Sequence, residues 1–182
     1  MTKDESLTGN VVADRVAFTC PWLSVREAVV RHGTGQANWY YLDHPGCALV
    51  LPITTNGDIV LIRAWRVAVR QWCWEAPAGR IDHAERPTDA ARRELLEEIG
   101  GTAAEMLELG SVFASSGSSN ERIHLFVGQA VTLGDSQPDP DEIITRELMT
   151  PGQALGLARS GRIEDAPTAL AILWAHDRRL LC

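Results

Sequence analysis

The chain has 182 residues, of which 45% are hydrophobic and 23% are charged, and its formal net charge is -7. This composition excludes a disordered or fibrous protein, and the acidic balance argues against a nucleic-acid or anionic-membrane surface, which needs clustered Lys and Arg. A chain of this length is expected to form one domain with an extra lobe.

The cysteines and the N-terminus concern the cellular setting. Four cysteines are scattered without CxxC pairs, which predicts free thiols rather than a zinc site or a disulfide framework. The first ten residues lack the apolar segment of a signal peptide, and no run approaches the roughly 18 apolar residues of a membrane span. We therefore expect a soluble, cytoplasmic protein without a membrane partner.

The first half of the chain reads mainly as strands. Short apolar patches alternate with turn-forming pieces between residues 11 and 41, which predicts a small antiparallel β lobe. Two apolar runs follow at 47–53 and 58–66, and the Asn56-Gly57 pair between them is typical of a hairpin. A third strand-like piece at 71–79 leads into a stretch in which the hydrophobic period becomes helical.

Pro87 suits the first turn of that helix and Gly100-Gly101 suits its end, so we expect a helix over 87–99. The rest of the chain predicts three more strands, at 106–115, 122–131 and 143–150, and then two helices, at 151–161 and 166–181. The order predicts an α/β (α+β) fold in which a β lobe, residues 1–43, precedes a mixed core domain, residues 44–182.

The predicted helix gathers negative charge. Glu94, Glu97 and Glu98 lie on one side of it at about 100° per residue, and we expect them to face a common point while Leu95, Leu96 and Ile99 pack on the sheet. Like charges at this spacing repel each other, and Mg²⁺ prefers carboxylate oxygens, so a divalent cation would offset the repulsion. The alternative is a solvated acidic face partly neutralised by neighbouring arginines.

The spacing of polar residues over 79–100 is specific. The fixed positions are Gly79, Glu85, Arg93-Glu94-Leu95, Glu97-Glu98 and Gly100, separated by five, seven, one and one residues. This pattern resembles the Nudix hydrolase box. It departs from the box at Gly101, where an aliphatic packing residue is preferred. The resemblance implies a mixed sheet between helices and hydrolysis of a nucleoside diphosphate linked to another moiety.

The resemblance also implies roles for these residues. Glu94 and Glu98 would be the main ligands of Mg²⁺ or Mn²⁺ and the centre of catalysis, assisted by Glu97 and by the backbone carbonyl of Ala78. Arg93 would orient the carboxylates through ion pairs. In the same comparison, Gly79 would permit the tight entry to the loop, and Glu85 would anchor it.

Segments on either side of the box resemble the ADP-ribose pyrophosphatase branch of that family. "RAWRVAVRQWCWEAPAGRID" is similar to the "RQYR…WELPAG" segment, and "GRIEDAPTALAI" is similar to the closing helix. In this comparison Arg66 would contact a substrate phosphate and Glu75 would lie near the phosphates. The branch forms homodimers through its first lobe, where Trp39, or alternatively Trp22 or Tyr40, would stack on a base.

The loop after the box is expected to select the substrate. It reads Ser115-Ser116-Gly117 where the branch often has "SPG", which makes Ser116 a substrate-binding candidate. Glu121 matches a branch glutamate and is a further candidate for metal or base contact. The general base is expected from a late acidic loop, as Glu142 or Asp141, with His83 and His124 as weaker candidates.

These resemblances imply a metal-dependent hydrolase that converts ADP-ribose to AMP and ribose 5-phosphate. Within the same mechanism, the substrate could instead be another nucleoside diphosphate sugar, such as GDP-mannose, or an oxidised nucleotide. A different class of function is a Nudix-fold module that binds a nucleotide sugar without cleaving it. Such modules generally lose the box glutamates, and all of them are present here.

Overall fold

The computed structural model describes residues 10–21, 23–32, 35–136 and 143–181. Backbone contacts divide the chain into two compact units, one made of residues 1–44 with 113–122 and the other of residues 45–112 with 123–182. The sequence indicated no link between residues 113–122 and the first unit. The role of residues 1–43 as a functional domain of their own stays a prediction.

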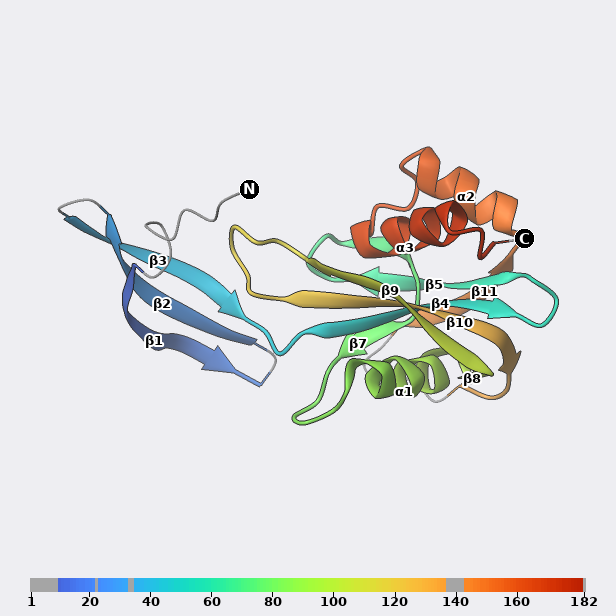
Figure 1. The fold of residues 1–182 in the computed structure, drawn as a ribbon, viewed down its shortest axis with the longest axis horizontal. Coiled ribbons are helices and arrows are strands. Elements are labelled where there is room, and N and C mark those ends of the chain that lie inside the picture. The colour runs from blue at the N-terminus through green and yellow to red at the C-terminus, as the bar shows by residue number, and fades with distance from the viewer. Residues whose placement is uncertain (1–9, 22, 33–34, 137–142, 182) are drawn as a thin grey trace. The chain divides into compact units, whose positions relative to one another are not determined.

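The first unit is an antiparallel sheet. Its strands lie in the order β1-β2-β3 (Figure 1), with bounds Val11–Cys20, Leu23–His32 and Gly35–Asp43. The loop at 113–122 joins it through the end of β3, where the Leu42 N–H donates to the Ser118 carbonyl at 2.8 Å. The antiparallel lobe expected from the sequence is therefore confirmed.

The second unit is built on a mixed sheet with the strand order β11-β5-β4-β10-β8. β4 (Cys47–Thr54) pairs in parallel with β10 (Arg122–Leu133) and antiparallel with β5 (Ile59–Arg66). The remaining strands pair at the sides of these three: β6 with β5, β7 with β4, β8 and β9 with β10, and β11 with β5. Their bounds are Gln71–Glu75, Ala78–Arg80, Gly101–Thr102, Glu105–Phe113 and Ile144–Met149.

Helices cover both faces of this sheet. α1 (Pro87–Ile99) lies on one face, while α2 (Pro151–Arg159) and α3 (Ala166–Asp177) lie on the other (Figure 1). β4 shows why, because Ala48 and Val50 join the core under α1 while Leu49 and Leu51 join the core under α3. A strand that is buried on both faces reads as a continuous apolar run. The predicted mixed sheet between helices is confirmed.

The α1 bounds agree with the sequence prediction. Pro87 lies at the start of the helix, and Gly100 ends it in the left-handed conformation, φ 65°, with its N–H bonded to the Leu96 carbonyl at 2.9 Å. The packing prediction for Leu96 is wrong, because that side chain is 54% exposed. The buried face of α1 consists of Ala90, Ala91, Glu94, Leu95, Glu98 and Ile99. Leu96 lies about 100° around the helix from Leu95 and is therefore outside this face.

The turn between β4 and β5 and two of the cysteines agree with the sequence predictions. The Asn56-Gly57 turn joins β4 and β5 as an antiparallel pair, and the Thr54 N–H donates to the Asp58 carbonyl at 2.8 Å. Cys20 and Cys73 are free thiols, as predicted, whereas Cys182 lies outside the described residues. In the described part of the chain, no helix has the length and apolarity to span a membrane.

The departure from the Nudix box at Gly101 has a packing reason. A Cβ atom at this position would lie 2.8 Å from Leu95 Cδ1 and 2.9 Å from Leu95 Cγ, so the Leu95 side chain already fills the space. Leu95 is 1% exposed and belongs to the core under α1. In this chain the Leu95 side chain of α1 therefore fills the space that a side chain at position 101 would occupy.

We predict that Gly101→Ala destabilises the protein, because the added methyl overpacks a filled core. The free energy of unfolding, measured by urea titration, should fall by about 1–3 kcal/mol. Gly156→Ala is the matched control, since Gly156 lies in α2, where a Cβ atom would meet no neighbouring side chain or strand within 4 Å. That change should be neutral or stabilising by up to about 1 kcal/mol. Equal stability of the two variants would contradict the packing argument.

Candidate active site

β7 brings the backbone of the box beneath α1. This short strand pairs antiparallel with β4, so that Leu49 faces Ala78 and Ala48 faces Gly79. The Val50 N–H donates to the Pro77 carbonyl at 2.9 Å and fixes the approach to the strand. The entry to the box is thus a rigid edge of the sheet, over which the helix side chains can lie.

Gly79 leaves room for the carboxylate of Glu94. A Cβ atom at position 79 would lie 2.6 Å from Glu94 Oε2 and closer still to Oε1 and Cδ, so a side chain there would require the Glu94 carboxylate to move. The Glu94 residue itself is 8% exposed. A residue other than glycine at this position would displace the carboxylate from the strand.

Glu98, one helical turn further on, lies against the same strand. It is 4% exposed, and its Oε2 accepts a hydrogen bond from the Ala78 N–H at 3.1 Å. Buried carboxylates are costly unless their oxygens are paired or hydrogen-bonded. Two adjacent carboxylates on the buried face of α1 therefore require specific partners.

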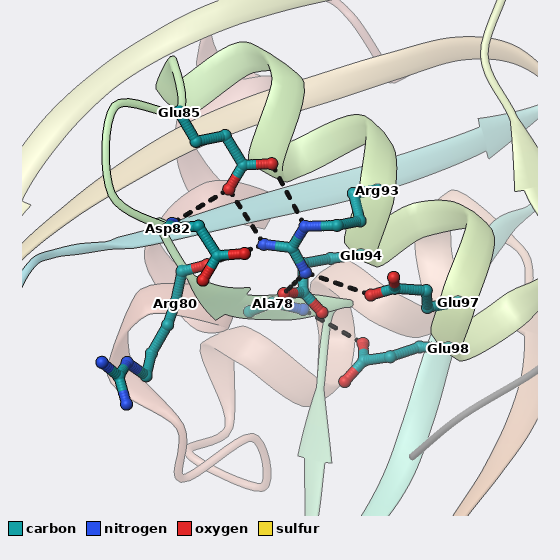
Figure 2. A network of polar contacts seen from close by, with 8 residues as sticks. All are labelled: Ala78, Arg80, Asp82, Glu85, Arg93, Glu94, Glu97 and Glu98. Atoms are coloured by element: carbon teal, nitrogen blue, oxygen red, sulfur yellow. Dashed lines mark hydrogen bonds and ion pairs between the residues drawn. The ribbon is translucent and has the colours of Figure 1, made fainter. Parts of the chain in front are cut away.

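Arg93 provides positive charge beside three of the carboxylates around β7 and α1. Its Nη1 donates to Glu94 Oε1 at 2.5 Å and to Glu97 Oε2 at 3.0 Å, while Nε and Nη2 donate to the two oxygens of Glu85, each at 3.1 Å. Figure 2 shows the guanidinium between these three carboxylates. The rigid fork of arginine donors suits such a set of acceptors. These contacts raise the pKa of Arg93, chiefly through Glu85, so its charge is permanent.

Glu85 closes the loop that precedes the helix. Its Oε2 accepts from the Asp82 N–H at 3.0 Å, and its two oxygens bind Arg93. Arg93 also donates from Nη2 to the Arg80 carbonyl at 2.8 Å. The Arg80 side chain points away from Arg93 and its carboxylate partners (Figure 2). The Arg93 hydrogen bond lowers the pKa of Glu85. Glu85 thus joins the loop to the helix, in the anchoring role that the family resemblance implies.

The three helix carboxylates do not face one common point. Glu94 and Glu97 share Arg93, whereas Glu98 turns to the Ala78 N–H (Figure 2), so the expectation of a single point of convergence is wrong. Each carboxylate is held by the donor it contacts, which is Arg93 for Glu94 and Glu97 and the Ala78 N–H for Glu98. Within the described residues, no three His, Cys, Asp or Glu side chains are arranged to hold a metal ion.

The chemistry of the donor set still fits a hard divalent cation. Carboxylate oxygens are the protein ligands that Mg²⁺ and Mn²⁺ prefer, and Glu94 and Glu98 lie together at the edge of β7. The glycine at position 79 gives one of these carboxylates a space of its own. The Ala78 carbonyl belongs to the same strand, and its role as a ligand stays a prediction.

Arg66 and Glu75, the predicted phosphate-side residues, form an ion pair. Arg66 Nε donates to the two Glu75 carboxylate oxygens at 2.9 and 3.1 Å, and Nη2 donates to Oε2 at 2.5 Å. The pair joins neighbouring strands, β5 and β6. Glu75 is 8% exposed, whereas the Arg66 side chain is 44% exposed. The carboxylate therefore holds an arginine that still reaches solvent.

Trp39 and Ser116, two other predicted substrate-binding residues, lie in the first unit and line one cavity of about 590 Å³. Tyr41 also lines it, and its hydroxyl donates to Asp14 Oδ2 at 2.8 Å. Tyr40, which the sequence did select, lines the same cavity and donates from its hydroxyl to Glu27 Oε1 at 3.0 Å, whereas Tyr41 was not among the candidates. The two-residue period of a strand places Tyr41 on the same face as Trp39 and could have identified it.

The remaining residues that the sequence suggested for metal binding, base stacking or general-base catalysis have few described contacts or none. Glu121 belongs to the first unit, where its Oε1 lies 3.6 Å from His44 Nδ1, and its role at a metal stays a prediction. His83 is exposed and His124 is partly buried in β10. The other candidates from the sequence, Trp22, Asp141 and Glu142, lie outside the described residues.

Comparison with known proteins agrees with this geometry. A family model of the NUDIX domain matches residues 43–170. An ADP-ribose pyrophosphatase of Bacillus subtilis (strain 168) is 33% identical over 140 residues, 76% of each chain. A GDP-mannose pyrophosphatase of Salmonella arizonae is 29% identical over 152 residues, 75% of each chain.

The crystal structure of an ADP compounds hydrolase has the same fold, with a TM-score of 0.79 at 17% identity over 92% of this chain and 91% of that one. The family model spans the sheet, α1 and its carboxylates, so it covers the whole of the site around β7. The chain therefore belongs to the NUDIX domain family, as a Nudix hydrolase similar to ADP-ribose pyrophosphatases.

Proposed function

We propose that this Nudix pyrophosphohydrolase cleaves the pyrophosphate bond of a nucleoside diphosphate sugar, with ADP-ribose as its substrate and AMP and ribose 5-phosphate as products. The observation that carries the proposal is the placement of the Glu94 carboxylate in the space left by Gly79, beside Glu98 on the same strand. The relative from Bacillus subtilis, named an ADP-ribose pyrophosphatase, supports the choice of substrate.

In this proposal Glu94 and Glu98 hold Mg²⁺ or Mn²⁺, with Glu97 and the Ala78 carbonyl as further ligands, while Glu121 stays a candidate from the family resemblance alone. Bound ions of this kind neutralise charge on a pyrophosphate and lower the pKa of an attacking water. Arg93 fixes the rotamers of Glu94 and Glu97 through its Nη1 hydrogen bonds. Glu142 is the proposed general base.

Arg66 is the proposed contact to a substrate phosphate, since a guanidinium matches phosphate oxygens through paired N–H donors. Glu75 holds it by hydrogen bonds to Nε and Nη2, so the planar group has a fixed orientation before substrate arrives. Holding such a group in place reduces the entropy lost on binding. Glu75 thereby contributes near the phosphates without having to touch them.

The cavity of the first unit suits a nucleobase. Trp39, Tyr41 and Phe113 give it aromatic walls, and Ser116 and Asn120 add polar groups. Flat rings stack on aromatic side chains, while polar groups at the edge of a ring fix its orientation. We propose that a base binds here in a homodimer formed through the first lobe, and we retain a cytoplasmic location as a prediction.

A second candidate substrate is GDP-mannose, favoured by the relative from Salmonella arizonae that is named for it. The carboxylates and Arg93 would act in the same way on either substrate. An oxidised nucleotide, and binding of a nucleotide sugar without cleavage, are the remaining alternatives. A single assay separates all four.

We predict hydrolysis of ADP-ribose in the presence of Mg²⁺ or Mn²⁺. The purified chain should be incubated with ADP-ribose, GDP-mannose and an oxidised nucleoside triphosphate, and the products should be separated by ion-exchange chromatography. AMP and ribose 5-phosphate should form fastest, and chelation by EDTA should stop their formation. Faster cleavage of another compound would correct the substrate, and tight binding without any cleavage would overturn the enzyme proposal.

We predict that Glu98→Gln removes most turnover while the fold is retained, because the introduced amide oxygen can still accept from the Ala78 N–H but carries no charge. Loss of one electrostatic group of an active site typically lowers kcat by about 10²- to 10³-fold. Glu105→Gln, an exposed change in β9, is the control and should keep full kcat. A Glu98→Gln variant as active as this control would show that the assignment of Glu98 is wrong.

We predict that Glu85→Gln reduces stability at pH 7, by about 1–3 kcal/mol, because hydrogen bonds between charged groups are lost. The pKa of Glu85 is lowered from 4.5 by Arg93, so its contribution is complete above pH 4.5 and is lost as pH falls through the folded value. Urea unfolding at a series of pH values should therefore show wild type and variant converging in acid. Parallel curves, like those expected of Glu105→Gln, would contradict this account.

A further inference from the structure

The first turn of α3 contains a buried threonine that contacts the entry to the box. Thr168 is 0% exposed, and its Oγ1 accepts a hydrogen bond from the Ala76 N–H at 2.8 Å. Ala76 is also 0% exposed and lies between the end of β6 and the start of β7. A buried backbone N–H outside a strand ladder needs a partner of its own. The Thr168 hydroxyl provides it.

Thr168 is itself held by the cap of the helix. Asp165 is the N-cap residue of α3, and its Oδ2 accepts from the Thr168 N–H at 3.0 Å. Burial raises the pKa of Asp165, and hydrogen bonds from the side chain and the backbone of Thr168 partly oppose that rise. An N-cap with a proline in the first turn fixes the start of a helix. The Thr168 hydroxyl therefore belongs to a rigid group.

The segment that this hydroxyl contacts joins both halves of the proposed active site. At its start Glu75 binds Arg66, and at its end the Ala78 N–H donates to Glu98 Oε2. These two points are three positions apart along the chain. A shift of the backbone at Ala76 would thus move the phosphate-binding arginine and the metal-binding carboxylate relative to each other.

We propose that Thr168 is a positioning residue, whose hydroxyl fixes residues 75–78 and so sets the Arg66–Glu75 pair against Glu98. This inference rests on the proposed hydrolysis, because it gives Arg66 and Glu98 their roles. Misplacement of reacting groups by about 1 Å can lower a rate about 10²-fold. A hydroxyl that touches no substrate can therefore control the rate through the backbone.

The kinetic test compares Thr168→Val, which keeps the shape and removes the hydroxyl, with Thr168→Ser, which keeps the hydroxyl. We expect kcat to fall about 10- to 100-fold in the valine variant and to stay within about threefold of wild type in the serine variant. Thr150→Val is the matched control, because Thr150 Oγ1 accepts from the Gln153 N–H at the start of α2. It should lower thermal stability without lowering kcat.

Unchanged kcat in Thr168→Val, or an equal fall in Thr150→Val, would overturn the proposal. A second readout does not depend on turnover: amide hydrogen exchange at Glu75, Ala76 and Ala78, followed by NMR. The Ala76 amide should exchange slowly in wild type and in Thr168→Ser, and faster in Thr168→Val but not in Thr150→Val.

Rapid exchange of Ala76 in the wild-type protein would overturn the inference even if Thr168→Val did not fold. If wild type cleaves no nucleotide sugar, the proposed hydrolysis fails, and the exchange pattern alone then decides whether Thr168 holds the segment. Slow exchange that is lost only in Thr168→Val would support the positioning role in that case as well.

Discussion

The close approach of α1 to β7 is the constraint on which the site depends. The Glu94 carboxylate occupies space that any side chain at position 79 would need, since even its more distant oxygen, Oε2, lies 2.6 Å from the Cβ position. A helix can lie this close to a strand only where the strand has no side chain on that side. The same approach brings Glu98 within 3.1 Å of the Ala78 N–H. The absence of a side chain at Gly79 thus leaves room for the Glu94 carboxylate, and the Ala78 N–H holds Glu98 beside it.

Buried carboxylates need a positive charge or hydrogen-bond donors close by, and Arg93 provides the positive charge. Glu94 and Glu98 are 8% and 4% exposed, and isolated charges at such depth would be strongly destabilising. Arg93 contacts Glu85, Glu94 and Glu97 together, so one cation links the loop before the helix to the helix itself. Glu98, the fourth carboxylate, is held by the Ala78 N–H instead.

Sequence reasoning succeeded where local chemistry decides the structure. Pro87 and Gly100 mark the helix ends, because the constraints of proline and the left-handed cap act within a few residues. It failed for Leu96, since which helix face is buried depends on the sheet below. The Arg66–Glu75 pair depends on the register of β5 and β6, and Thr168 meets Ala76 across 92 positions of sequence. A single sequence does not reveal such distant contacts.

Residues 75–78 receive support from both helical layers of the second unit. From one face, Glu98 of α1 accepts the Ala78 N–H, and from the other, Thr168 of α3 accepts the Ala76 N–H. β4 contributes side chains to the cores on both faces of the sheet, and residues 75–78 add hydrogen bonds to a helix on each face. Packing on the α3 side, remote from the box in sequence, can therefore affect the geometry of the carboxylates on α1.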